Sequence, residues 1–253
     1  MRRSDRCEPL EPSIPRQLEH YYYLLLDLLT LSYPLAKSFD RRLKFVRFWP
    51  GVFLGIAVMC LLFVPWDVWF TARGVWGFNE QYISGIQIAN LPIEECLFFI
   101  VVPFACAFIY EVLNYFLPNS PLKSAQNKIT AALILVSFVL SVLFVDRLYT
   151  FTTFSLLCLL LIWHLLINRS DYLGQFFLAF IIIQIPFLIV NGALTGLFTQ
   201  EPVVWYNNAE NLNLRILTIP VDDIGYNMLM LLIVISVLEQ YKVRKFSGEL
   251  TVT

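Results

Sequence analysis

The stretch LPIEECLFFIVVPFACAFIYEVLNYF, residues 91–116, decides the fold of this 253-residue chain. It opens with a proline and two acidic residues and continues as a mostly apolar run. About 20 apolar residues are enough to cross the hydrocarbon core of a bilayer as a helix. Proline suits the first turn of a helix, where backbone N–H groups lack intrahelical partners. We therefore expect a transmembrane helix over 92–116 that begins at its acidic pair.

The composition extends this expectation to the whole chain. Hydrophobic residues make up 58% of it and charged residues only 15%, whereas soluble domains are about one quarter charged. A single soluble core could not bury this much apolar surface, so much of it must face lipid. The net charge of -1 gives no indication of a nucleic-acid partner.

Apolar runs of span length recur along the chain. We predict an all-α membrane protein that crosses the cell membrane about seven times, with helices over 21–39, 49–70, 92–116, 129–145, 149–167, 172–190 and 220–241. The domain organisation we expect is a polar tail over 1–20, a three-helix repeat over 21–116, a loop and spacer helix over 117–148, a second three-helix repeat over 149–241 and a basic tail over 242–253.

An internal repeat supports this division. LPIEE at 91–95 matches IPVDD at 219–223, and WGFN at 76–79 is echoed by VWYN at 204–207. Each acidic motif ends a long loop and starts a long apolar helix. The number of crossings between the two motifs is even because of the spacer helix, so both motifs enter the membrane from the same face. Parallel repeats of this kind are a known membrane architecture.

The acidic doublets are the main candidates for chemistry. Glu94 and Glu95 stand in the first turn of one long helix, and Asp222 and Asp223 stand in the first turn of the other. Acidic side chains also favour the helix macrodipole at this position, worth ~0.3–1 kcal/mol each. Ionisable groups at membrane depth are costly and usually functional. Two doublets at the same point of a repeat favour the functional interpretation, so we predict that all four are catalytic.

Adjacent carboxyl groups offer a specific chemistry. Two like charges in a medium of low dielectric do not both ionise easily, so one group keeps its proton while its neighbour stays a carboxylate. Such a doublet supplies an acid and a base together. It can add a proton to an alkene and remove another from the resulting cation. On this hypothesis the chain needs no cofactor and no metal.

Further candidates lie near the doublets. Phe98 and Phe99 follow the first doublet by one turn, and Trp66 precedes the same loop. Aromatic faces attract cations by ~0.5–2 kcal/mol, although helix packing and interfacial belts also account for such residues. Asp67 ends the second expected span, and Asn191 occupies its place in the second repeat. We predict that Asp67 is catalytic, and that Asn191 and the three aromatic residues stabilise the substrate cation.

These motifs resemble a known family. The dipeptide WD at 66–67 and the run LPIEECLFF at 91–99 resemble the first half of the integral-membrane lycopene cyclases. The segments VNGALT at 190–195 and RILTIPVDD at 215–223 resemble the second half. In some bacteria the two halves are separate three-span subunits, and elsewhere they are fused. The resemblance covers about residues 20–241.

The resemblance implies a lycopene cyclase, an isomerase (intramolecular lyase) of carotenoid biosynthesis. Such enzymes form β-ionone rings on the ψ-ends of lycopene and γ-carotene by protonation, cyclisation of the cation and deprotonation. The partners it implies are the polyene, the lipid bilayer and, through contact, other carotenoid enzymes. One departure is visible: the family motif in the second half is Glu-Asp, whereas this chain has Asp222 and Asp223.

Other membrane functions fit less well. A transporter or proton relay should carry more polar residues deep in its spans, and the middle spans offer little beyond His164 and Gln184. A retinal protein needs a lysine in its last span, and none lies within 220–241. A prenyltransferase needs spaced aspartates, not the adjacent pair Asp222 and Asp223.

Overall fold

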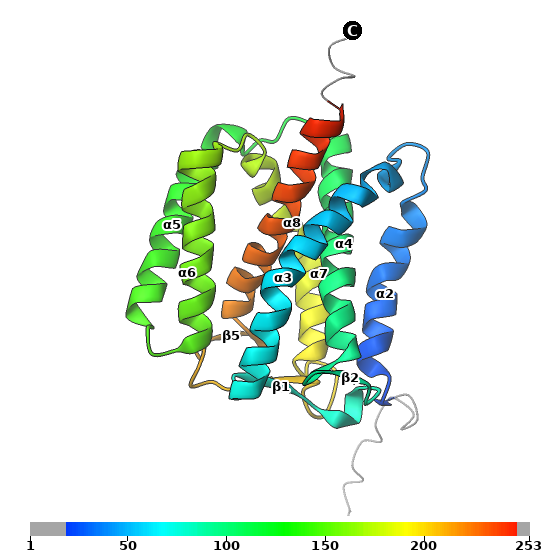
Figure 1. Cartoon of the computed structure of the whole chain (residues 1–253), viewed down its shortest axis with the longest axis vertical. Helices are drawn as coiled ribbons and strands as arrows, with labels where there is room; N and C mark the ends of the chain where they lie inside the picture. The colour runs from blue at the N-terminus through cyan, green and yellow to red at the C-terminus, as the bar shows by residue number, and fades with distance from the viewer. Residues whose placement is uncertain (1–18, 247–253) are drawn as a thin grey trace, which may run out of the picture.

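The computed structural model describes residues 19–246 as a bundle of long helices with short strands at one end (Figure 1). The helices are α2 (Tyr22–Lys37), α3 (Trp49–Arg73), α4 (Ile93–Phe116), α5 (Gln126–Leu143), α6 (Leu148–Ile162), α7 (Leu173–Leu194) and α8 (Asp222–Phe246). Short helical turns occupy Phe45–Phe48, Glu80–Tyr82, Lys123–Ala125 and Trp163–Asn168, the last of them a π-helix. The strands are β1 (Trp76–Phe78), β2 (Gln87–Ile88), β3 (Leu91–Pro92), β4 (Val204–Tyr206), β5 (Arg215–Ile216) and β6 (Ile219–Pro220).

The predicted all-α membrane class is confirmed. Within the described residues, six helical segments are long and apolar enough to cross a bilayer, namely Phe45–Arg73, Ile93–Phe116, Lys123–Leu143, Leu148–Asn168, Leu173–Leu194 and Asp222–Lys245. The first expected span is shorter than predicted. Its helix α2 has 16 residues and a length of about 24 Å, against about 30 Å for the hydrocarbon core.

The two acidic motifs enter the bundle from the same end, as the parallel repeat predicts. Figure 1 shows the loops that carry β1, β2 and β5 together at one end, opposite the end of α8. Repeat one comprises α2, α3 and α4, repeat two comprises α6, α7 and α8, and α5 lies between them in the chain. Helix α5 packs mainly on α6 at the side of the bundle.

A short β-ribbon ties the two repeats together around a pseudo-twofold axis. Strands β1 and β4 pair antiparallel, with Gly77 opposite Trp205 at the centre, and these two residues are counterparts in the repeat. A Cβ atom at Gly77 would collide with the Trp205 ring, so any other residue there would force that ring to move. The flanking hydrogen bonds are reciprocal: the N–H of Asn79 donates to Val203 and the N–H of Asn207 donates to Val75, both at 2.8 Å.

Each long loop then forms the same hairpin before its acidic helix. Strand β2 pairs with β3, and β5 pairs with β6, in matching registers. The turns also match, because Ala89 and Leu217 both take positive φ angles, 57° and 58°. Such angles are uncommon for residues with a side chain. The shared positive φ angles show that the two hairpins have the same conformation, and each places an acidic doublet at the start of a helix.

Helix α3 lies tightly against α8. A Cβ atom added to Gly55 would be 2.7 Å from the carbonyl oxygen of Val234, and one added to Gly51 would be 2.6 Å from the Tyr241 ring. The Gly-x-x-x-Gly spacing in α3 therefore marks a close helix contact, as small residues do in membrane bundles.

Replacing Gly55 with valine is expected to cost about 1–3 kcal/mol of stability through overpacking. The loss would appear as a lower thermal midpoint of the detergent-solubilised protein. Ala57→Val, at an exposed position of the same helix, is the matched control and should leave the midpoint near that of the parent. Equal midpoints for both variants would contradict the close packing of α3 on α8.

Candidate active site

The first acid of each doublet holds its own loop. Glu94 is fully buried, and its Oε1 accepts the backbone N–H of Ser84 at 2.8 Å. Asp222 is equally buried, and its Oδ2 accepts the N–H of Leu212, the counterpart of Ser84, at 3.0 Å. Thr150 of α6 donates a further hydrogen bond of 2.5 Å to Asp222. These carboxyl groups therefore anchor the hairpin loop over the start of the acidic helix.

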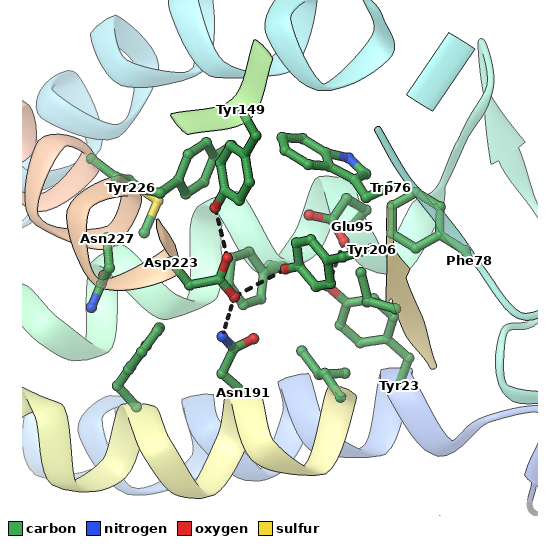
Figure 2. Close-up of a pocket in the computed structure, with 15 residues that line it drawn as sticks. Tyr23, Trp76, Phe78, Glu95, Tyr149, Asn191, Tyr206, Asp223, Tyr226 and Asn227 are labelled. Atoms are coloured by element: carbon green, nitrogen blue, oxygen red, sulfur yellow. Dashed lines mark hydrogen bonds between the residues drawn. The ribbon is translucent and has the colours of Figure 1, made fainter. Parts of the chain in front are cut away.

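The second acid of each doublet points into a shared pocket. Glu95 on α4 and Asp223 on α8 both line it, although they come from different repeats. Figure 2 shows the two side chains approaching from opposite walls. Residues at i and i+1 of a helix do not face the same way, which explains why one acid of each doublet anchors the loop while the other enters the pocket.

The Asp223 carboxyl group accepts three hydrogen bonds. Its Oδ1 accepts the hydroxyl of Tyr149 at 2.6 Å, and its Oδ2 accepts Asn191 Nδ2 at 2.7 Å and the Tyr206 hydroxyl at 3.1 Å. The dashed lines in Figure 2 mark these contacts. Three donors around one carboxyl group fit its ionised form, which is acceptor-only.

Glu95 has a sparser environment. Its Oε2 accepts one hydrogen bond, from the hydroxyl of Tyr23 on α2, at 2.6 Å. Tyr23 is the counterpart of Tyr149, since each stands near the start of the first helix of its repeat and donates to the second acid of that repeat. The two acids thus share one kind of tyrosine partner but differ in the number of donors they receive.

Removal of the Tyr206 hydroxyl from water, together with the nearby Asp223 charge, raises the pKa of this tyrosine well above its usual value. Tyr206 lies on β4, outside the membrane-spanning helices. It therefore keeps its proton over the physiological range and remains a hydrogen-bond donor to Asp223.

Aromatic rings form most of the remaining wall. Trp76 packs edge-on against Tyr149 with ring centroids 5.1 Å apart, and Tyr226 lies 6.0 Å from Trp76. The pocket has a volume of about 50 Å³, and its lining comprises Tyr23, Trp76, Phe78, Glu95, Phe98, Tyr149, Phe187, Asn191, Leu194, Val204, Tyr206, Asp223, Tyr226, Asn227 and Met230. Ring faces on several sides of a small pocket suit a cationic species.

Asn227 adds an unsatisfied polar group to this pocket. It lies one turn after Asp223 on α8 and is only 2% exposed. Both polar atoms of its amide lack a hydrogen-bond partner among the described residues. Buried polar atoms are nearly always paired in native structures, and exceptions often mark functional sites.

The remaining predicted site residues lie behind this wall or at its edge. Asp67 accepts the indole N–H of Trp76 at 2.5 Å and so fixes this ring. Trp66 packs against Tyr226 with centroids 5.3 Å apart and does not line the pocket. Phe99 is buried in the core, whereas Phe98 lines the pocket directly.

The structure pairs the acids differently from the sequence-based hypothesis. That hypothesis placed the two carboxyl groups of one doublet in one site. Instead, Glu94 and Asp222 are held by loop backbone, while Glu95 and Asp223 meet across the repeats. The pocket also contains four tyrosines that were not predicted as site residues, namely Tyr23, Tyr149, Tyr206 and Tyr226. Only Tyr206 carried a signal, because it lies in the repeated WGFN and VWYN segments.

Comparison with known proteins decides the family. The family model described as lycopene cyclase matches residues 20–113 and 146–241, one stretch for each repeat. The chain belongs to the lycopene cyclase family. The gap between the two matched stretches contains α5, the helix expected as a spacer.

Two curated relatives of the lycopene cyclase family are fungal. A protein named bifunctional lycopene cyclase/phytoene synthase from Pyrenophora tritici-repentis is 27% identical over 97 residues, which is 38% of this chain and 16% of that protein. A protein of the same name from Leptosphaeria maculans is 28% identical over 88 residues, 34% of this chain and 14% of its own length. The aligned part is thus a small share of each relative. No solved structure matches the chain.

In this member of the lycopene cyclase family, Glu94 and Asp222 should tolerate replacement by the corresponding amides but not by alanine. Glu94→Ala and Asp222→Ala leave the N–H groups of Ser84 and Leu212 without their acceptors, at an expected cost of about 1–3 kcal/mol each. Glu94→Gln and Asp222→Asn retain an acceptor oxygen and should recover most of that stability. Thermal unfolding of the four variants in detergent measures this. Amide variants as unstable as the alanine variants would contradict the anchoring role.

Proposed function

We propose that this protein is a lycopene β-cyclase that closes β-ionone rings on the ψ-ends of lycopene and γ-carotene. The observation that carries the proposal is the convergence of Glu95 and Asp223, one from each repeat, on a single pocket lined by tyrosines and Trp76. The family match supports the substrate class. The reaction is an isomerisation in which no atom is gained or lost overall.

Proton transfer opens the proposed reaction. An acid donates a proton to the terminal double bond of the ψ-end and leaves a carbocation. The neighbouring C5–C6 double bond then attacks this cation, which closes the six-membered ring and moves the positive charge to the ring. A base removes a proton from C6, and the electrons of that C–H bond form the ring double bond. The pair of carboxyl groups ends with one proton, as it began.

The hydrogen bonds support a separate role for each of the two acids. Asp223, with three donors, is suited to remain a carboxylate and to act as the base. Glu95, with the Tyr23 hydroxyl as its one hydrogen-bond donor, has an oxygen left to carry the proton that the alkene receives. Because the acids lie on different helices, they can stand on different sides of the same substrate end.

The other polar groups hold this arrangement in place. Glu94 and Asp222 fix the loops from which the catalytic helices start, and Asp67 orients Trp76. Trp76, Tyr149 and the ring of Phe98 surround the position where charge develops. A cation held between such faces gains about 0.5–2 kcal/mol per favourable contact, and Asn191 keeps Asp223 oriented at 2.7 Å.

Expression in cells that accumulate lycopene tests the proposal. The parent chain should convert lycopene to cyclic carotenoids that chromatography separates. Glu95→Gln should lower the conversion by about 100-fold to 10,000-fold, because the amide cannot donate the proton. Glu94→Gln is the matched control and should retain more than about one tenth of the conversion.

Two results would count against this function. Unchanged lycopene in cells whose membranes contain the folded parent chain would exclude cyclisation. Full conversion by Glu95→Gln would exclude the acid assigned here. Membrane levels of each variant, measured by immunoblot, distinguish lost chemistry from lost protein.

A further inference from the structure

A large apolar cavity adjoins the acid pocket. It has a volume of about 500 Å³ and lies between α2, α4 and α7. Its described lining is apolar, aromatic or neutral polar, with no Asp, Glu, His, Lys or Arg among the lining residues. Phe98, Phe187 and Asn191 line both this cavity and the acid pocket, so the two spaces meet at these side chains.

A third space continues the same path. A cavity of about 370 Å³ shares Tyr33, Phe108 and Ile109 with the apolar cavity and extends to Phe116 at the other end of α4. Lys37 and Arg42 stand at this far end. From Glu95 to Phe116 the path follows α4 for about 30 Å at 1.5 Å per residue. We call the two cavities together the α2–α4–α7 groove.

The pseudo-symmetric counterpart of this groove is closed. It would lie between α6, α8 and α3. There, Gly55 of α3 packs on the backbone of Val234, which is the counterpart of the groove residue Cys106. Gly225 of α8 likewise lies against Phe154 of α6, since a Cβ atom added to Gly225 would be 2.9 Å from the Phe154 ring. The two repeats therefore share one acid pocket, and the groove extends from it on one side.

We propose that the α2–α4–α7 groove binds the body of the polyene lengthwise, with the reacting end at Glu95 and Asp223 and the opposite end near Phe116. This inference rests on the proposed function and identifies where its substrate lies. The acid pocket alone, at about 50 Å³, holds only a few water molecules. The reacting end enters past the Phe98 and Phe187 side chains, which line both spaces.

The orientation has a consequence for the product. One acid pocket handles one end of the substrate at a time. Closure of a second ring requires the polyene to leave and return reversed, with its first ring at the far end of the groove. The far cavity, at about 370 Å³, is the space that has to admit that ring.

Tryptophan substitutions test the groove at two depths. Ala105→Trp fills its middle, and Ile182→Trp fills its far end. Each should lower both the lycopene retained by the purified protein and the rate of conversion at least tenfold. The matched controls are Ile100→Trp on α4 and Ile181→Trp on α7, whose side chains are exposed. These should stay within twofold of the parent.

The readouts separate the two proposals. Lycopene retained by the parent and lost from the groove variants, with no conversion, would support the groove and exclude the cyclase activity. Conversion by the parent that Ala105→Trp and Ile182→Trp leave unchanged would exclude the groove and leave the activity standing, with lipid acyl chains as the occupant. Equal losses in the exposed controls would also overturn the groove. If Ala105→Trp does not reach the membrane, Ala105→Leu should give a smaller loss in the same direction.

Discussion

The hydrogen bond between a buried carboxyl group and the backbone of its own loop controls the geometry of this protein. Glu94 accepts the Ser84 N–H, and Asp222 accepts the N–H of its counterpart Leu212. A buried carboxyl group without donors would be costly, so the loop must close over the helix start. Once the first acid is fixed in this way, the helical turn sends the second acid inward. The β1–β4 ribbon then sets the two inward acids against each other.

The two repeats share the devices that hold their acids but differ in how their helices pack. The hairpins, the loop anchors and the tyrosine partners of the second acids are the same in both repeats. The helices differ, because α3 packs on α8 through glycines whereas α4 and α7 enclose a cavity. Asn191 stands where the first repeat has Asp67. An aspartate at this position would add a third carboxyl group to the pocket beside Glu95 and Asp223, whereas the Asn191 amide donates a hydrogen bond to Asp223. This asymmetry gives Glu95 and Asp223 different surroundings and opens the site on one side.

Much of this was visible in the sequence, for physical reasons. Apolar length fixes a spanning helix, and the repeated Pro-x-acid-acid motif locates the helix starts, so the membrane class, the parallel repeat and the family were predicted. The pairing of the acids was not, because it depends on which face of a helix meets which neighbour. Adjacent residues such as Glu94 and Glu95 lie about 100° apart around the helix axis. Contacts such as that of Tyr23 with Glu95 join residues that are distant in the sequence. The expected span over 21–39 was slightly too long, because the helix already ends at Lys37, two residues before Phe39.

The central claim is that Glu95 and Asp223 form a single site built from both repeats. The most direct measurement compares the rate of lycopene conversion by purified Glu95→Gln, Asp223→Asn and the double variant, each corrected for folded protein. In a single site the two groups act as a unit, so either single variant should be nearly as inactive as the double variant. If each repeat held its own independent site, each single variant would keep about half of the parental rate, and that result would contradict the account.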